Sequence, residues 1–301
     1  MIKPSYLQAG DKIGVISTSN FTEESYINQL LDILKSWQLE PVLGKTIGPR
    51  AGSFAGPDEL RKNDLQEMLD NDAIKAILQT TGGYGIFRII DQVSFRNYKY
   101  KPKWIVGYSD TTFLHSHLQG SLGTASIQAT MAADLEAGYE EASWESLRKA
   151  LFGEELSYTI KTHPLNRAGV AEGILVGGTA SILCNAKGTF SEVNTNGNIL
   201  FLEEVGEKHF RLDSYIMSLK KAGKFKYLKG LIIGHLTDIL EDEPPFGMTP
   251  EEIIHNAVKE LDFPVCFGFP AGHSSPNLAL KFGIPVRLQV TTSGSTIRFM
   301  E

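Results

Sequence analysis

The sequence has few cysteines and lacks long apolar runs. No stretch of the 301 residues approaches the roughly 18 consecutive apolar residues that a membrane-spanning helix needs. The first residues, MIKPSYLQAGDKIGV, contain no apolar core of the kind found in signal peptides. The two cysteines, Cys184 and Cys266, lie in apolar runs, so we expect buried reduced thiols and no disulfide framework. These absences predict a soluble, cytoplasmic protein with no membrane partner.

An excess of basic charge is also missing. The chain has 29 Lys and Arg against 35 Asp and Glu, which gives a formal net charge of −6. Modules that bind nucleic acid are normally basic, so we expect no nucleic-acid partner. With 42% hydrophobic and 21% charged residues, the composition is that of a globular protein with a sizeable core. The length allows one large domain or two of ordinary size.

Strand and helix patterns alternate in the first half of the chain. Short apolar runs predict strands, and apolar residues at helical spacing predict helices between them. Pro41 favours an edge position for the second strand. The alternation predicts an α/β fold in residues 1–138, with a parallel sheet of the Rossmann or flavodoxin type. The expected strands are 12–17, 38–43, 73–79 and 103–106, and the expected helices are 23–37, 57–70, 111–119 and one that begins at 87.

The pattern changes after about Gly138. Residues 139–165 are polar and charged with one helical stretch, which predicts a connector. Residues 166–301 predict a β-rich mixed domain, with helices only at roughly 210–222 and 250–261. The strand candidates there are GILVGG, GNILFLEEV, KGLIIGHL, FPVCFGFP, PVRLQVTT and STIRFME.

Ligands of open α/β sheets bind beyond the carboxyl ends of the strands, so we looked there for reactive groups. The sharpest candidate is Ser109, which follows an apolar strand and Gly107 and precedes a helix. This order resembles a nucleophile elbow, although the spacing is not G-x-S-x-G. The helix N-terminus favours negative charge near the serine oxygen. The same residues also suit an ordinary helix cap, and spacing alone leaves both interpretations open.

A glycine-rich loop, Thr81-Gly82-Gly83-Tyr84-Gly85, follows another predicted strand. It lacks the third glycine of G-x-G-x-x-G and the lysine of a Walker A loop, which disfavours a phosphate or dinucleotide site. Its backbone N–H groups would suit an oxyanion that comes close to the chain. A plain glycine-rich turn explains the same residues, so that alternative also stays open.

A histidine and two acids follow strands in the second half. His273 lies in a Gly/Ser/Pro-rich loop, where a core histidine is not expected, and this favours a general base. Glu203 and Glu204 end an apolar strand and point to opposite faces, so one of them faces the cleft unless both are solvated. His115 and His117 are two residues apart and do not share a helix face, so no metal site is expected.

Taken in order, these loops resemble the LD-carboxypeptidases, a serine peptidase family that includes the microcin C immunity peptidases. The resemblance covers nearly the whole chain. The motifs that carry it are Leu7-x-x-Gly10-Asp11-x-Ile13, Gly82-Gly83-Tyr84-Gly85, Gly107-Tyr108-Ser109-Asp110-x-Thr112, Gly177-Gly178, Leu202-Glu203 and Gly272-His273-x-x-x-Asn277.

The resemblance implies a Ser–Glu–His triad in that chain order. Ser109 would be the nucleophile, Glu203 the orienting acid and His273 the base, which is the chemistry that an unactivated hydroxyl requires. The N–H groups of Gly83 and Asp110 would form the oxyanion hole. The implied activity is hydrolysis of an amide between an L-centre and a terminal D-amino acid, for example D-alanine release from murein tetrapeptide in peptidoglycan recycling. The family further implies a homodimer and no cofactor.

The sequence also departs from the family pattern. Tyr84 and Asn277 are expected to contact substrate, but Thr81 and Thr179 replace an Arg and an Asn that are common in the family. The segment 128–131 and the pair 213–214 also differ from the family's His-Gly-Pro-Met-like and Asp-Arg patterns. Two alternatives therefore remain: an immunity-type serine peptidase that acts on aminoacyl- or peptidyl-nucleotide conjugates, and a peptide-binding protein without catalysis.

Overall fold

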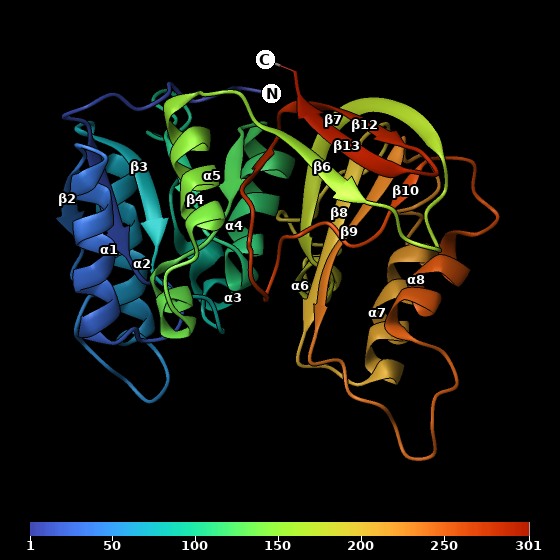
Figure 1. Ribbon diagram of the computed structural model, residues 1–301. Helices are drawn as coiled ribbons and strands as arrows, with labels where there is room; N and C mark the ends of the chain where they lie inside the picture. Colours follow the sequence, from blue (N-terminus) through green and yellow to red (C-terminus); the bar gives the residue numbers. More distant parts are fainter. Residues whose placement is uncertain (301) are drawn as a thin grey trace.

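The chain folds around two β-sheets, each flanked by helices. The computed structural model describes residues 1–300. Figure 1 shows the N-terminal half, blue to green, beside the C-terminal half, yellow to red. The first sheet is mostly parallel and the second is mixed, which confirms the predicted α/β fold with a β-rich C-terminal half.

The first sheet has six strands in the order β11-β5-β4-β3-β1-β2. The first five strands of the chain are parallel, and β11 is antiparallel to β5. Strand β2 lies at the edge, as Pro41 predicts. The bounds are β1 (Lys12–Ile16), β2 (Glu40–Leu43), β3 (Ile74–Gln79), β4 (Trp104–Val106), β5 (Ser126–Gln128) and β11 (Leu280–Phe282).

The helices of the first half form where apolar residues recur at helical spacing. In α1, Ile27, Leu30 and Leu34 form one buried face. Helix α5 begins after Glu140, whose carboxylate accepts a hydrogen bond from the N–H of Ser143, and such an N-cap satisfies an otherwise unpaired donor. The bounds are α1 (Glu24–Ser36), α2 (Asp58–Asp70), α3 (Ile86–Ile89), α4 (Thr112–His117) and α5 (Glu141–Phe152).

The second sheet has seven strands in the order β10-β9-β8-β7-β12-β13-β6. Strands β7 to β10 are parallel, and β12, β13 and β6 extend the sheet as antiparallel neighbours. The strands are β6 (Ser157–Lys161), β7 (Gly169–Thr179), β8 (Ile199–Val205), β9 (Gly230–Thr237), β10 (Val265–Cys266), β12 (Pro285–Val290) and β13 (Gly294–Phe299). The helices are α6 (Ala180–Asn185), α7 (His209–Lys221) and α8 (Pro250–Val258).

Side chains from the two sheets pack together in one buried apolar cluster. Leu78 and Val106 of the first sheet belong to the same apolar cluster as Phe201 and Leu288 of the second. Strand β11 comes from the C-terminal half but completes the first sheet, while β6, within the expected connector, pairs in the second. Domain boundaries at 138 and 165 therefore stay a prediction, because one strand from the C-terminal half belongs to the first sheet and the expected connector contributes a strand to the second.

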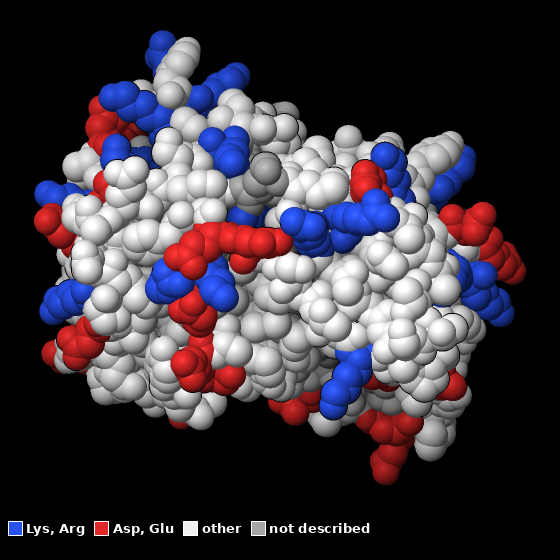
Figure 2. Space-filling view, turned by 45° about the horizontal axis from the view of Figure 1, so that its top comes forward, with Lys and Arg blue, Asp and Glu red and all other residues white. Residues whose placement is uncertain are grey.

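Both cysteines are free; Cys266 is buried and Cys184 is half-buried. Burial raises the pKa of the Cys184 thiol to about 11, so it stays protonated at neutral pH. Within residues 1–300, no helix has the length and hydropathy that crossing a bilayer requires. On the face shown in Figure 2, basic and acidic side chains are interspersed.

Candidate active site

Ser109 occupies a strained turn between β4 and α4. Its φ is 59°, in the left-handed region that residues other than glycine rarely adopt. Such a conformation costs about 1–3 kcal/mol and is kept where the surrounding structure enforces it. A short 3-10 turn, Ser109–Thr111, leads directly into α4, and the side chain is partly exposed. The strand–strained serine–helix order is that of a nucleophile elbow.

A buried carboxylate holds this turn on one side. Asp110 is 1% exposed and accepts hydrogen bonds from the hydroxyl of Ser19 at 2.6 Å and from the N–H of Ile86 at 2.9 Å. Burial raises the pKa of Asp110 to about 6. The side chain of Asp110 therefore fastens the glycine-rich loop to the turn, while its backbone N–H stays available.

A buried histidine holds the other side. His115 is fully buried, and its Nε2 donates to the carbonyl of Gly107 at 2.8 Å. A carbonyl only accepts, so Nδ1 is the acceptor for the hydroxyl of Ser126 at 2.9 Å. Burial lowers the pKa of His115 to about 4, so the ring is neutral at pH 7. His115 thus supports the backbone just before the serine.

The glycine-rich loop lies against Ser109. A Cβ atom added to Gly82 would lie 2.7 Å from Ser109 Oγ, closer than packed atoms allow, so only glycine fits there. Within residues 1–300, neither the N–H of Gly83 nor that of Asp110 donates to a protein acceptor. Unpaired backbone N–H groups, one from the loop that lies against Ser109 and one from the residue after it, are donors of the kind that an oxyanion hole uses.

The structure brings Glu203 and His273 together. Nδ1 of His273 donates to Oε2 of Glu203 at 2.7 Å, and Glu203 is 1% exposed. This bond fixes the tautomer of the ring and leaves Nε2 free. The rings of His273 and Tyr108, the residue before Ser109, pack edge to face with 4.8 Å between centroids. Within residues 1–300 the Ser109 hydroxyl forms no hydrogen bond, and contacts of this kind often form only when substrate binds.

Two opposing effects set the pKa of His273. Burial lowers it, but the charge of Glu203 and its hydrogen bond outweigh burial, so the pKa lies above the ordinary value of 6.5. A histidine in this state is a stronger base than a free imidazole. His235 lies near the same pair, and its pKa is lowered, chiefly by burial.

Thr179 connects Glu203 to the serine helix. Its hydroxyl donates to Oε1 of Glu203 at 2.5 Å, and its N–H donates to the hydroxyl of Thr112 in α4 at 3.2 Å. Thr179 ends β7, beside β8 that carries Glu203, so strand pairing sets this contact. Both oxygens of the Glu203 carboxylate are thereby held, one by His273 and one by Thr179. The threonine that departs from the family pattern has a structural partner here.

Replacing Thr179 with valine is expected to lower kcat/KM for peptide hydrolysis about 10-fold or more. The substitution keeps the shape but removes a charge-assisted hydrogen bond, worth about 1.5–3 kcal/mol when the acceptor is ionised. Thr179→Ser, which keeps the hydroxyl, should retain most of the activity. Steady-state kinetics of the two variants checks this, and equal losses in both would contradict a role for the hydroxyl.

Glu204 faces away from His273. Its carboxylate accepts from the N–H of Ser181, at the start of α6, at 2.7 Å and from the N–H of Val205, at the end of β8, at 3.1 Å. Burial is the main reason that the pKa of Glu204 rises to about 7. The opposite faces predicted for Glu203 and Glu204 are therefore confirmed, but neither side chain is solvated.

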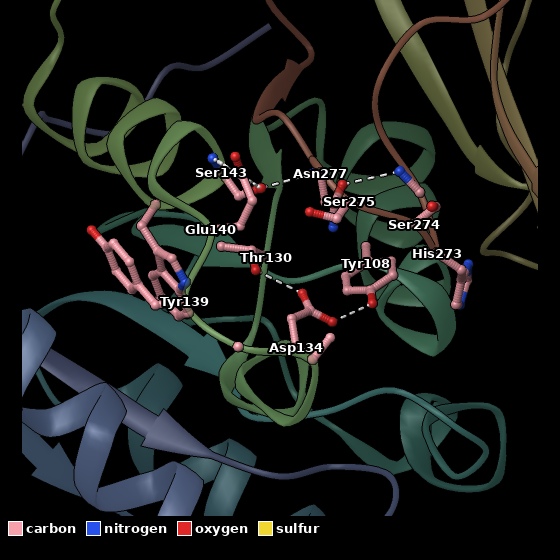
Figure 3. A pocket seen from close by; sticks show the side chains of 14 residues that line it. Tyr108, Thr130, Asp134, Tyr139, Glu140, Ser143, His273, Ser274, Ser275 and Asn277 are labelled. Carbon is pink, nitrogen blue, oxygen red and sulfur yellow. Dashed lines mark hydrogen bonds between the residues drawn. The ribbon is translucent and has the colours of Figure 1, made fainter.

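A pocket of about 230 Å³ opens beside His273 (Figure 3). Asn277, predicted as a substrate contact, is 4% exposed and lines it. Its Oδ1 accepts from the N–H of Gly272 at 3.0 Å. Tyr84, the other predicted contact, is 49% exposed, packs on Phe54 at 6.3 Å between centroids, and does not line this pocket.

Sequence reasoning missed several polar residues of this site. Asp134 and Ser143 line the pocket, but they lie at or beside the segment that the sequence predicts to be a connector. A signal exists in retrospect: each pairs locally with a position three residues earlier, Met131 and Glu140, in the pattern of a helix start. Among residues 1–300, no group of three His, Cys, Asp or Glu is arranged to hold a metal ion.

Known proteins resemble this chain over most of its length. A family model described as the LD-carboxypeptidase N-terminal domain matches residues 13–129, and one described as the LD-carboxypeptidase C-terminal domain matches residues 172–288. The chain is 30% identical to a probable murein peptide carboxypeptidase of Bacillus subtilis, over 98% of this chain and 94% of that protein.

Solved structures show the same fold at lower identity. The muramoyltetrapeptide carboxypeptidase of Oxalobacter formigenes superimposes with a TM-score of 0.88 at 23% identity, covering 96% of this chain and 99% of that one. The microcin C7 self-immunity protein of Escherichia coli, in complex with aspartyl sulfamoyl adenosine, gives a TM-score of 0.84 at 22% identity, covering 98% of each chain. On the family models and the relative from B. subtilis, the chain belongs to the LD-carboxypeptidase family.

Proposed function

We propose that this protein is a serine carboxypeptidase that hydrolyses the amide between an L-centre and a terminal D-amino acid. Release of D-alanine from murein tetrapeptide is the activity that fits best. The observation that carries the proposal is the buried Glu203–His273 pair, whose ring packs on the residue before the strained Ser109. Relatives named as murein peptide carboxypeptidases support the substrate class.

The geometry supports an acyl-transfer mechanism. Ser109 Oγ attacks the amide carbon while Nε2 of His273 takes its proton, and Glu203 stabilises the imidazolium that forms. The N–H groups of Gly83 and Asp110 receive the developing oxyanion. His273 then gives the proton to the nitrogen of the leaving amino acid, and the C–N bond breaks. In the second half of the reaction His273 takes a proton from a water molecule, whose oxygen attacks the acyl carbon. The bond to Ser109 Oγ then breaks, and His273 returns the proton to that oxygen.

The remaining assignments belong to the same proposal. Asn277 contacts the substrate inside the pocket, and Tyr84 contacts it from the rim of the glycine-rich loop. We also propose that the protein acts as a cytoplasmic homodimer, as the family resemblance implies. Chromatography coupled to light scattering measures the oligomeric state directly.

The function is tested with two tetrapeptides that differ only in the configuration of the terminal alanine. The wild-type protein is expected to release D-alanine from the natural isomer and little or no L-alanine from the other. Chromatographic analysis of the released amino acid gives both rates. Equal rates for the two isomers, or release from neither, would refute the proposed specificity.

A second candidate function keeps the same residues and changes the substrate to an aminoacyl-nucleotide conjugate. The observation that favours it is the close structural match to the microcin C7 self-immunity protein, together with the changed residues at Thr81 and Gln128. Comparing kcat/KM on a murein tetrapeptide and on aspartyl sulfamoyl adenosine separates the two functions. We expect the tetrapeptide to be preferred.

A further inference from the structure

Tyr108 links the proposed nucleophile to the proposed base. It precedes Ser109 in the chain, and its buried ring packs edge to face with the ring of His273, 4.8 Å between centroids. Within residues 1–300 no hydrogen bond joins Ser109 to His273. The relative position of these two groups therefore depends on the side chains around them, and Tyr108 contacts one while it is bonded to the other.

The far end of the Tyr108 ring is held by Asp134 (Figure 3). The tyrosine hydroxyl donates to Oδ1 of Asp134 at 2.5 Å. Burial raises the pKa of Tyr108 well above its ordinary value, and Asp134 adds to this effect, so the hydroxyl keeps its proton and donates. A hydrogen bond to a carboxylate is stronger than one between neutral groups. The ring is thus restrained at both ends, by the serine turn and by the carboxylate.

Asp134 is itself fixed by its surroundings. Its Oδ2 accepts from the hydroxyl of Thr130 at 2.7 Å and from the N–H of Met131 at 3.0 Å. These bonds lie at the start of the short 3-10 helix that follows β5. The N–H of Ala133 in that helix donates to the carbonyl of Thr80, just after β3, at 2.9 Å. A side chain locked in this way can hold a partner in one geometry.

Asp134 also acts on His273 through its charge. Within residues 1–300 no hydrogen bond or ion pair joins the two side chains. Burial lowers the pKa of His273, and Glu203, by charge and hydrogen bond, raises it most. The charges of Glu204 and Asp134 act in the same direction as Glu203. The other histidine near this ring is His235 of β9, whose pKa burial lowers, so it is neutral at pH 7.

We propose that Asp134 is a positioning residue for His273. It fixes the Tyr108 ring against which His273 packs, and its charge supports the imidazolium that forms during the reaction. The inference rests on the proposed function, because it assigns Asp134 a role in the mechanism proposed there. The hydrogen bond determines how well the histidine is oriented, and the charge determines how readily it takes a proton. A residue that only bound substrate would do neither.

The test measures how fast a fluorophosphonate labels Ser109 as the pH is varied. This reagent needs an activated serine but no murein peptide. Asp134→Asn should slow labelling about 10-fold, the lower end of what a hydrogen bond to a charged group contributes. It should also move the acid limb of the rate to lower pH, because a charge that favours the imidazolium is lost. Tyr108→Phe keeps the ring and the carboxylate, so it should slow labelling by a similar factor and leave the limb in place.

A double variant and a control complete the test. Asp134→Asn with Tyr108→Phe should lose about 10-fold above the acid limb, because both changes break one hydrogen bond; independent effects would multiply to about 100-fold. Glu136→Gln removes an exposed charge from the same 3-10 helix and does not touch the pocket, so it should change neither rate nor limb. On murein tetrapeptide, Asp134→Asn should lower kcat and leave KM within about twofold.

Several results would overturn the inference. They are an unmoved acid limb in Asp134→Asn, a double variant that loses the product of the two single effects, or a raised KM with unchanged labelling. If circular dichroism shows that Asp134→Asn does not fold, Tyr108→Phe decides alone, and undiminished labelling overturns the inference. If labelling behaves as expected but the wild-type protein releases no D-alanine, the proposed function fails and the role of Asp134 stands.

Discussion

Replacing Ser109 with alanine is expected to lower kcat for D-alanine release at least about 10⁴-fold. Loss of the nucleophile in a serine peptidase removes about six orders of magnitude, and only binding and oxyanion stabilisation remain. The remaining N–H groups of Gly83 and Asp110 do not depend on the hydroxyl, so some rate above the uncatalysed reaction should survive. Release is measured under single-turnover conditions with purified tetrapeptide.

The control for Ser109→Ala is Ser25→Ala, a change of the same chemistry at an exposed position on α1. It should leave kcat within about twofold, because exposed substitutions rarely matter. Circular dichroism and the melting temperature should be close to wild type for both variants, since the serine hydroxyl forms no hydrogen bond within residues 1–300. Substantial release by folded Ser109→Ala protein would remove Ser109 from the mechanism.

Glu203→Gln is expected to lower kcat by about 10³–10⁴-fold, while Glu204→Gln changes it by less than about threefold. The glutamine can present an NH₂ donor to Nδ1 of His273, which favours the wrong tautomer, and it cannot stabilise the imidazolium. Glu204 contacts Ser181 and Val205 instead, and its pKa of about 7 makes a neutral side chain nearly equivalent there. The two variants differ by one position on β8, so each controls for the other.

The same pair of variants predicts a change in pH dependence. The proposed base, His273, can take a proton only when neutral, so kcat/KM of the wild-type protein should rise with pH through a pKa above 6.5. Without the Glu203 charge, burial dominates and the pKa of His273 falls. The acid limb of the residual Glu203→Gln activity should therefore move to lower pH, and an unmoved limb would contradict the coupling of Glu203 to His273.

Local patterns predicted much of the fold because they are periodic. The strands β1, β3 and β4 and the helices α1 and α2 lie where apolar spacing places them, within one or two residues at each end. Strands β5 and β11 were missed. They pair with each other across more than 150 positions of the chain, and local spacing patterns carry no information on such a contact.

The sequence predicted the site only in part, because several of its contacts join segments that are far apart in the chain. Loop chemistry indicated Ser109 and His273, but the choice between Glu203 and Glu204 depends on which face of β8 meets a loop 70 residues away. In the sequence, Thr179 stood out only because it replaces an Asn that is common in the family. Its role could not be predicted, because its hydrogen-bond partners come from β8 and α4. Contacts between sheets, rather than any motif, decide these roles.

The central claim, that Ser109 is a nucleophile activated by His273 and Glu203, is tested most directly by covalent labelling. The wild-type protein is treated with a fluorophosphonate, and the adduct is located by peptide mass mapping while D-alanine release is measured on the same sample. We predict one adduct per chain, on Ser109, with activity lost in proportion to labelling. Labelling on another residue in proportion to lost activity, or full release by protein already modified at Ser109, would contradict the account.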